Sequence, residues 1–495
     1  MGDLASPEQG KITIAIAGGG IAGLALAAGL TKQPHVTVRV YESVPQYRDV
    51  GAGLALHLNA IKAMSLIGPE LRCAYFDKAL AMAADKDTEM ATEVILAQGE
   101  SKGIRVAELG RAKGRMSIAR SDLLDGFWGL LSKDTVVFGK KLASISTKTP
   151  SSVGSSGQNY REQEMIQMTF TDGTTAEADV LIGADGVHSL TRNHLLGDDH
   201  PATGPKNHDD WVVYRTMVSM DEARRCIDVK WCGNGVPILL GPRGHVNIIP
   251  LNKATRLSAG VAVRGASNPD LVAASSSQPS GDREAGGGQK RLDPDNYTDY
   301  TEEAQKIIKM IAKDTSASWK PADHDHAPFY ARGNIAMIGD AAHASLPFAG
   351  NGAAQALEDS AVLVALFDRL RDPWHIGRAL RAYDVVRRER SQKVVDLARK
   401  FGRVYAYAED GMHESPEKMK GFFREMSRFT NEFDVAGQNR EAVELFDMLV
   451  WMEDEENRKR SGLANGLSAM NDLREKVNGA VEVREANRVN GTISC

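Results

Sequence analysis

Residues 11–30 read KITIAIAGGGIAGLALAAGL, and this stretch decides the fold of the N-terminal part of the chain. Its first seven residues are rich in β-branched side chains and predict a short buried strand of a parallel sheet. Glycines follow, and the small-residue run at 21–30 predicts a closely packed helix. Since VTVRVYES at 36–43 predicts a second strand, the whole unit has the size of a βαβ element.

The turn between this strand and helix matches the GxGxxG fingerprint of dinucleotide-binding sites, through Gly18, Gly20 and Gly23, with Ala22 before the last glycine. The three glycines allow a tight turn, a close approach to a pyrophosphate and close helix packing. The helix N-terminus offers free N–H groups to phosphates. Glu42 lies 24 residues after Gly18, where it can bond a ribose hydroxyl and repel a 2′-phosphate. The segment therefore predicts NAD or FAD and not NADP.

Bulk composition narrows the class of protein. A chain of 495 residues predicts two or three domains, and a net charge of −5 without a concentrated basic face argues against a nucleic-acid partner. The four cysteines are scattered and form no CxxC pair, so we expect no disulfide framework and no metal site. We see no signal peptide and no apolar run long enough to span a membrane. We expect a soluble, intracellular, cytoplasmic protein, a monomer or homodimer.

Three further segments narrow the cofactor. They are VLIGADGVHSLTR at 180–192, GNIAMIGDAAHASLPFAGNGAAQALEDS at 333–360 and GAGLALHLNAIKAMSLIG at 51–68. With them, the chain resembles the group A FAD-dependent aromatic hydroxylases of the salicylate and para-hydroxybenzoate hydroxylase type, from about residue 11 to about residue 400. The resemblance implies FAD as the bound cofactor.

The resemblance also implies particular cofactor contacts. Asp185 and Gly186 would lie by the pyrophosphate, Arg120 would contact the phosphates, and Asp340 would accept a hydrogen bond from a ribitol hydroxyl. Arg192 would steady the turn after Asp185, and His343 would be a structural residue of the flavin turn. The residues expected next to the flavin ring, where a helix starts near residue 352, are Gly53, Gly350, Asn351 and Gly352.

The family chemistry implied is hydroxylation of an aromatic, phenolic or natural-product small molecule. NADH or NADPH would reduce FAD, and O2 would then form a flavin C4a-hydroperoxide that transfers oxygen. On the strand WVVYRTMV, Tyr214 and Arg215 point to opposite faces. We choose Arg215 as the substrate-facing catalytic residue; the alternative is that Arg215 forms an ion pair between strands and Tyr214 lies in the core. Because Ile249 replaces a tyrosine found in some relatives, the acid–base group stays open between His57 and His245.

Other functions compete with this interpretation. The GDAAH stretch at 339–343 invites a hydrolase or metal site, but no GxSxG motif is present and the DHDH cluster at 323–326 reads as a solvated turn. An FAD-dependent reductase or dehydrogenase without oxygen transfer remains an alternative. A non-enzymatic FAD-binding protein is the alternative from another class.

The predicted fold class is α/β, with a Rossmann-like FAD-binding domain interleaved with a mainly antiparallel β-sheet substrate domain and followed by a helical C-terminal region. The lysine- and arginine-rich stretch at 379–407 is interpreted as a solvated helix face. The predicted segments are 1–75, 105–195 and 326–368 for the FAD domain, 76–104 and 196–325 for the substrate domain with a loop insertion at 265–291, and 369–495 for the helical region.

Overall fold

The computed structural model describes residues 11–47, 53–81, 89–113, 116–148, 165–231, 235–251, 255–266 and 292–460. The predicted insertion at 265–291 lies almost wholly outside these ranges. The chain forms two compact units, residues 1–444 and 445–495. The described part of the second unit is the end of helix α13 (Val435–Arg460), and everything below concerns the first unit.

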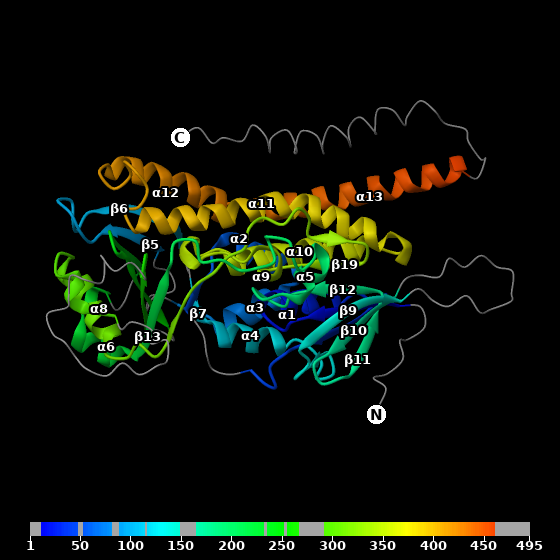
Figure 1. Cartoon of the computed structure of the whole chain (residues 1–495), viewed down its shortest axis with the longest axis horizontal. Coiled ribbons are helices and arrows are strands. Elements are labelled where there is room, and N and C mark those ends of the chain that lie inside the picture. The colour runs from blue at the N-terminus through cyan, green and yellow to red at the C-terminus, as the bar shows by residue number, and fades with distance from the viewer. Residues whose placement is uncertain are drawn as a thin grey trace. The chain divides into compact units, whose positions relative to one another are not determined.

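A six-stranded sheet lies in the right-hand part of the view in Figure 1. The neighbouring strands are parallel except for the pair β18–β19, as the βαβ pattern predicts. In sheet order the strands are β18 (Ala331–Arg332), β19 (Ile335–Met337), β12 (Val180–Gly183), β1 (Ile12–Ala17), β2 (Val36–Tyr41) and β8 (Val136–Val137).

Helices α1 (Ile21–Leu30) and α10 (Gly352–Arg369) pack against each other beside this sheet. A methyl group built at Gly29 would lie 2.4 Å from Val364 Cγ2, so the small residues of α1 permit the close packing that was predicted. Nearby are α2 (Leu58–Ile67), α3 (Pro69–Lys78), α4 (Arg120–Trp128), α5 (Leu190–Leu196) and the short α9 (Asp340–His343).

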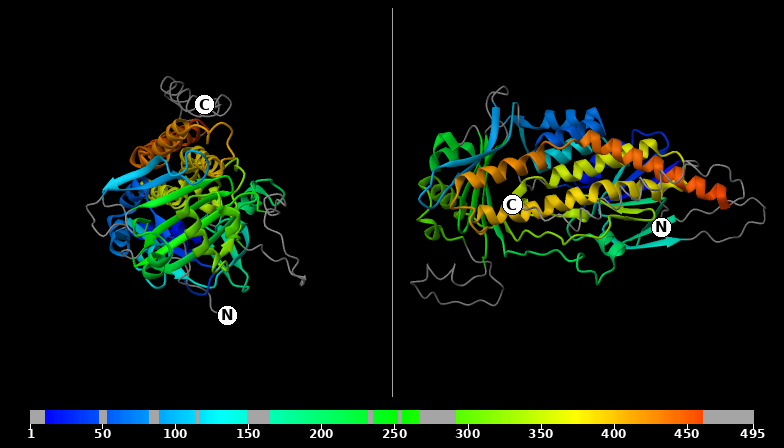
Figure 2. Two further views of the ribbon diagram at one scale, coloured as in Figure 1. Left: turned by 90° about the vertical axis from the view of Figure 1, so that its left-hand side faces the viewer. Right: turned by 90° about the horizontal axis from the view of Figure 1, so that it is seen from above.

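A seven-stranded sheet forms the second layer, seen face-on in the left view of Figure 2. Its order is β17 (Ser318–Trp319), β13 (Val212–Ser219), β16 (Arg256–Val263), β15 (Gly244–Leu251), β14 (Val236–Gly241), β5 (Glu89–Leu96) and β6 (Arg105–Lys113). It is mainly antiparallel, as predicted, but β14 and β5 pair in parallel, so the sheet is mixed. Strand β6, which lies in a segment predicted for the FAD domain, pairs with β5 in this sheet.

The two faces of this sheet have different neighbours. One face packs on α6 (Met220–Cys226) and α8 (Glu302–Ala312) and buries Tyr214 among apolar side chains. The other face turns toward α11 (Ile376–Tyr405) and α12 (Pro416–Asn431), which supply Phe401, Tyr405 and Phe423. Smaller sheets are β11 (Thr175–Ala178), β10 (Met165–Phe170) and β9 (Leu142–Lys148), and β3 (Gly53–Ala55), β7 (Met116–Ala119) and β4 (Leu80–Ala81).

The long helix α11 corrects one expectation. Its arginines were interpreted as a solvated face, but Arg387 is fully buried and Arg390 is 6% exposed. Both guanidinium groups bind Glu358 of α10, at 2.6 Å and 2.7 Å. Since a buried charge is tolerated only with a partner, α11 is an internal helix on this side.

Candidate functional site

The predicted cofactor segments meet at one edge of the six-stranded sheet. Gly18 follows β1, Glu42 follows β2, Asp185 follows β12 and Asp340 follows β19. Since the carboxyl ends of parallel strands share an edge, four segments far apart in the sequence line one cavity of about 750 Å³. Every residue predicted to contact the cofactor lies in its wall except Gly23, and Arg215 lies there too.

The loop after β1 is shaped by its glycines. Gly18 has a φ of +108°, and a methyl group built on it would lie 2.2 Å from the carbonyl oxygen of Ala184. A methyl group on Gly23 would lie 2.0 Å from the carbonyl oxygen of Gly18. Gly23 therefore lets the helix pack closely on the loop, although it does not itself line the cavity. Gly20, by contrast, has no atom within 4 Å of such a group. The open space at Gly20 fits the approach of a pyrophosphate to the backbone.

Glu42 holds this loop and faces the cavity. Its Oε2 accepts a hydrogen bond of 2.6 Å from the Gly19 N–H, and its Oε1 accepts one of 2.9 Å from the Val44 N–H. A carboxylate has about four acceptor positions, so acceptor capacity remains for a ribose hydroxyl.

Asp185 and Arg192 stabilise the loops around the cavity. The Asp185 carboxylate accepts hydrogen bonds from Ser189 Oγ and from the Thr191 N–H, and burial raises the pKa of this carboxyl. Arg192 is fully buried and donates to the carbonyl oxygens of Ala341 at 3.0 Å and Ala342 at 2.8 Å. Burial lowers the pKa of Arg192 to about 10, so it stays charged at neutral pH. It therefore ties the 180–192 segment to the turn that carries Asp340.

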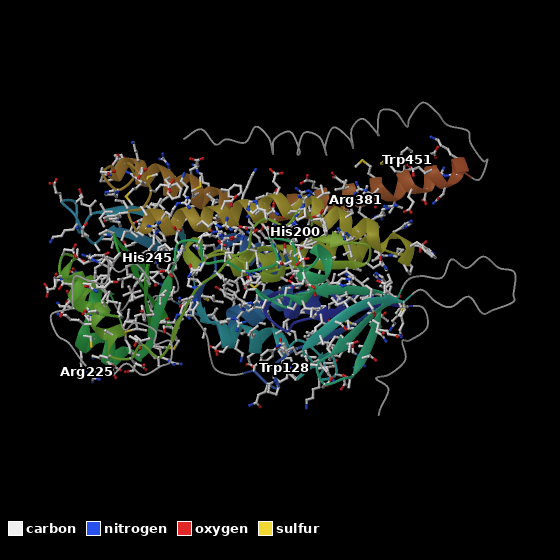
Figure 3. All side chains as sticks on the ribbon, viewed as in Figure 1. Trp128, His200, Arg225, His245, Arg381 and Trp451 are labelled. Atoms are coloured by element: carbon white, nitrogen blue, oxygen red, sulfur yellow. The ribbon has the colours of Figure 1, made fainter. Side chains whose placement is uncertain are left out.

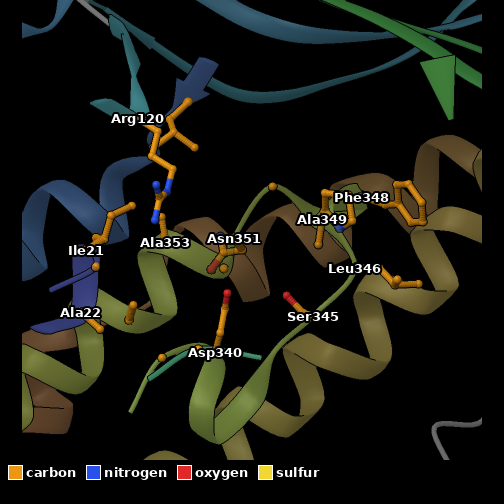
Figure 4. A pocket seen from close by; sticks show the side chains of 18 of the residues that line it. Ile21, Ala22, Arg120, Asp340, Ser345, Leu346, Phe348, Ala349, Asn351 and Ala353 are labelled. Carbon is orange, nitrogen blue, oxygen red and sulfur yellow. The ribbon is translucent and has the colours of Figure 1, made fainter. Parts of the chain in front are cut away.

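The Asp340 side chain is exposed to the cavity and makes no hydrogen bond to any residue that the structure describes. Figure 4 shows its carboxylate directed toward the start of α10, near Asn351. The protein packed around the cavity raises the pKa of this carboxyl through desolvation. A carboxylate held in a cavity without a partner fits the role predicted for it, acceptance of a hydrogen bond from a ribitol hydroxyl.

The turn behind Asp340 is fixed by Asp359 of α10, a residue that the sequence reasoning did not single out. Asp359 Oδ2 accepts from the Gly339 N–H at 2.9 Å and lies 2.6 Å from His343 Nε2, while its Oδ1 accepts from Arg387 at 2.8 Å. The charge of Arg387 and the contact with His343 lower the pKa of Asp359 against the effect of burial. Its signal in the sequence was the Glu358–Asp359 pair inside an apolar helix.

The N-terminus of α10 opens onto the cavity. Gly350 has a φ of +60°, Asn351 is the N-cap residue, and no side chain caps the first turn. Arg120, at the start of α4, reaches the same space, as Figure 4 shows. Free N–H groups and a guanidinium together make this wall electropositive and suited to the phosphates and flavin of FAD.

The other end of the cavity is aromatic. Arg215 lies over the Trp319 ring at 4.3 Å and forms no ion pair with any described residue, while burial lowers its pKa. The predicted alternative placed Arg215 in an ion pair inside the sheet and Tyr214 in the core: no such ion pair is present among the described residues, whereas Tyr214 is buried in the core. Phe348 packs on Trp211 with ring centroids 4.4 Å apart.

His57 and His245, the two candidates for the acid–base group, line the cavity, as does Ile249. His245 is 7% exposed, its Nδ1 has no hydrogen-bond partner among the described residues, and burial lowers its pKa to about 3. Its ring lies 4.9 Å from that of Tyr405, beneath α11 and α12 (Figure 3). His57 packs against Gly110 of β6.

The DHDH cluster is not a solvated turn. Asp323 is fully buried and pairs with Arg399 at 2.7 Å. Within the described ranges, no three side chains are grouped to hold a metal ion, and no helix is long and apolar enough to cross a membrane.

Several known proteins are similar to this chain in sequence and in fold. Residues 153–398 match the family model described as "FAD binding domain". The chain is 33% identical over 450 residues to a 6-methylsalicylate 1-monooxygenase of Aspergillus terreus, covering 89% of this chain and 93% of the relative. It is 29% identical over 401 residues to the salicylate hydroxylase of Pseudomonas putida, covering 80% and 86% of the two chains. A solved salicylate hydroxylase substrate complex superposes with a TM-score of 0.70 at 27% identity, covering 88% and 99%.

Proposed function

Because the chain belongs to the FAD-dependent aromatic monooxygenases, we propose that it uses NADH or NADPH and O2 to hydroxylate a phenolic carboxylic acid of the salicylate type. The observation that carries the substrate class is Arg215. A guanidinium without a carboxylate partner among the described residues faces a cavity walled by aromatic side chains. The names of two relatives, a 6-methylsalicylate monooxygenase and a salicylate hydroxylase, point to the same class.

When bound and reduced, FAD supplies the activation of O2 and the transfer of one oxygen atom to the ring. The loop after β1, Glu42 and Asp340 bind and orient the cofactor, and the free N–H groups of α10 favour negative charge on it. Asp340 does so as a hydrogen-bond acceptor for a hydroxyl.

The aromatic end of the cavity orients the substrate. Arg215 binds the carboxylate in a charge-assisted pair, and its own position is fixed by the Trp319 ring. Phe348, which is 6% exposed, contributes an apolar wall that excludes water from the reacting ring. His245 is neutral at physiological pH because burial lowers its pKa to about 3, so it serves as a neutral hydrogen-bonding group for the phenol.

The experiment compares salicylate with salicylamide, which lacks the carboxylate charge, in assays of substrate-stimulated NADH or NADPH oxidation by the FAD-loaded protein. We expect stimulation by the acid and not by the amide. Arg215→Ala should lower kcat/KM for the acid by about 10- to 100-fold, the size of one charge-assisted contact, while the FAD content stays unchanged.

The matched control is Arg243→Ala. Arg243 also lies over an aromatic ring, at 5.6 Å from the centroid of Tyr300, but pairs with Asp299 and does not line the cavity. Equal turnover of acid and amide, or equal losses in the two arginine variants, would remove the carboxylate-binding role of Arg215.

A further inference from the structure

Helix α12 forms part of the cavity wall, although no motif was found in this region of the sequence. Ser427, Thr430 and Asn431, from its last turn, line the cavity. Thr430 is 2% exposed and Asn431 is 6% exposed. Two nearly buried polar side chains at a cofactor cavity require hydrogen-bond partners. These partners show which part of the site is positioned by the end of α12.

Asn431 contacts Asn351, the N-cap residue of α10. Asn351 Nδ2 donates to Asn431 Oδ1 at 3.1 Å, and Asn351 Oδ1 accepts from Gln355 at 2.9 Å and from Asn59 at 3.3 Å. Asn431 Nδ2 in turn donates to Ser427 Oγ at 3.1 Å. Asn351 is 2% exposed, so its amide group is held in one orientation by partners on three helices.

A buried ionic cluster supports this amide chain from behind. Glu358 accepts from Asn59 at 2.9 Å and from Gln355 at 3.2 Å, and it pairs with Arg387 and Arg390. Arg390 also donates to the carbonyl oxygen of Phe429 in α12 at 3.0 Å. The end of α12 is therefore joined to the start of α10 directly through Asn431 and indirectly through Arg390.

We propose that Asn431 is a positioning residue of the FAD site, which acts through Asn351 to hold the first turn of α10 in the orientation that directs its N–H groups into the cavity. The positive end of a helix stabilises negative charge, and reduction adds negative charge to the flavin. A fixed first turn therefore favours reduced over oxidised FAD. Asn431 thus sets the ratio of the two affinities from outside the motifs that bind the cofactor.

The experiment measures the midpoint potential of the loaded protein against that of free FAD, and this difference gives the ratio of the affinities for reduced and oxidised FAD; the affinity for oxidised FAD is measured beside it. Asn431→Ala should lower this ratio by about fivefold, the size of one helix-terminus interaction. Asn431→Leu keeps the buried volume and removes both polar contacts, so it should give the same change if the alanine variant folds poorly.

The matched control is Asn439→Ala. Asn439 is a buried amide that also binds α10, through the carbonyl oxygen of Ala361 at 3.1 Å, but neither residue lines the cavity. It should leave the ratio unchanged. If Asn439→Ala changed the ratio as much as Asn431→Ala does, the effect would come from loss of packing in general, and the proposal would be overturned.

A double-mutant cycle tests whether Asn431 acts through Asn351. Asn351→Ala should lower the ratio by itself, and adding Asn431→Ala should lower it no further, because contacting residues in one network are not additive. Additive losses, or a wild-type ratio in Asn431→Ala, would contradict the proposal. These readouts do not depend on turnover, so they stand apart from the substrate proposed above.

Discussion

The Nε2 atom of His343 lies 2.6 Å from Oδ2 of Asp359, and both side chains are almost completely buried. The same carboxylate accepts from the Gly339 N–H and pairs with Arg387. One charged group therefore joins the turn that carries Asp340 to helices α10 and α11. The Asp340 carboxylate at the cavity is therefore positioned by the contacts that Asp359 makes on the other side of the turn.

Replacing Asp359 should weaken the whole fold. Asp359→Asn keeps the volume but removes the carboxylate partner of His343 and one of the two carboxylate partners of the buried Arg387, which keeps Glu358, so the free energy of unfolding should fall by about 3 kcal/mol. Urea denaturation measures it. The control, Asp396→Asn, breaks a pair with His326 in which the carboxylate is 53% exposed, and should cost at most about 1 kcal/mol. Equal losses in the two variants would contradict the anchoring role.

Replacing Asp340 should weaken FAD binding and leave the stability of the fold unchanged. Since its carboxylate has no hydrogen-bond partner among the described residues, Asp340→Ala should leave the unfolding of the cofactor-free protein unchanged and weaken FAD binding by at least about tenfold, as expected for a lost charged hydrogen bond. Flavin fluorescence gives the affinity. Asp185→Ala provides the contrast, because it removes the carboxylate at the start of α5 and should destabilise the protein by about 1 kcal/mol. Undiminished FAD affinity in Asp340→Ala would exclude it as a ligand.

The glycines of the first loop should separate folding from binding. Gly18→Ala places a methyl group 2.2 Å from a backbone oxygen at a positive φ, so little folded protein should form. Gly20→Ala meets no atom within 4 Å and should fold normally, yet bind FAD weakly because the methyl group occupies the space of the pyrophosphate. Soluble yield, thermal unfolding and FAD titration distinguish the two. Normal FAD affinity in Gly20→Ala would mean that the cofactor lies elsewhere.

The buried His245 predicts a dependence of stability on pH. Burial lowers its pKa in the folded state to about 3, whereas the unfolded side chain takes up a proton near pH 6.5. The unfolded state therefore binds more protons below that pH, and stability falls as the pH is lowered from about 6.5 toward 3. Between pH 7 and pH 5 this amounts to about 2 kcal/mol.

His245→Gln should remove that part of the acid sensitivity, as measured by urea unfolding at the two pH values. His375→Gln, at a half-exposed position, serves as the control and should keep the wild-type difference. If His245→Gln loses as much stability as the wild type on acidification, the imidazole is not held neutral in the fold.

The residues that the sequence assigns to the cofactor meet at one cavity in the fold, and they could be found because their signals are local. A glycine after an apolar strand or an acid at a strand end reports the turn in which it lies, and parallel strands bring those turns together. Gly18, Glu42 and Asp340 were found in this way, and all three line the cavity. The start of α10 at Gly352 was also predicted correctly.

Arg192 and His343 were predicted as supporting residues, but Asp359, Arg387 and Asn431 were not, because their burial depends on partners far away in the chain. The arginines of α11 follow a pattern typical of a solvated helix until Glu358 and Asp359 of α10 are placed against them. Asn431 lies in a polar helix without a motif, and only the fold brings it to Asn351. The parallel pairing of β5 with β14 places Thr92 beside Val236. These residues are so far apart in the sequence that no local pattern could have predicted how the two strands align.

The central claim, oxygen transfer to a phenolic carboxylic acid, is tested most directly with isotopically labelled O2. The FAD-loaded protein is incubated with salicylate or 6-methylsalicylate and NADH or NADPH, and the products are examined by mass spectrometry. We predict a hydroxylated aromatic product that carries one labelled oxygen atom, formed in proportion to the nicotinamide oxidised. Oxidation of the nicotinamide without any labelled product, across both acids and both nucleotides, would contradict the account.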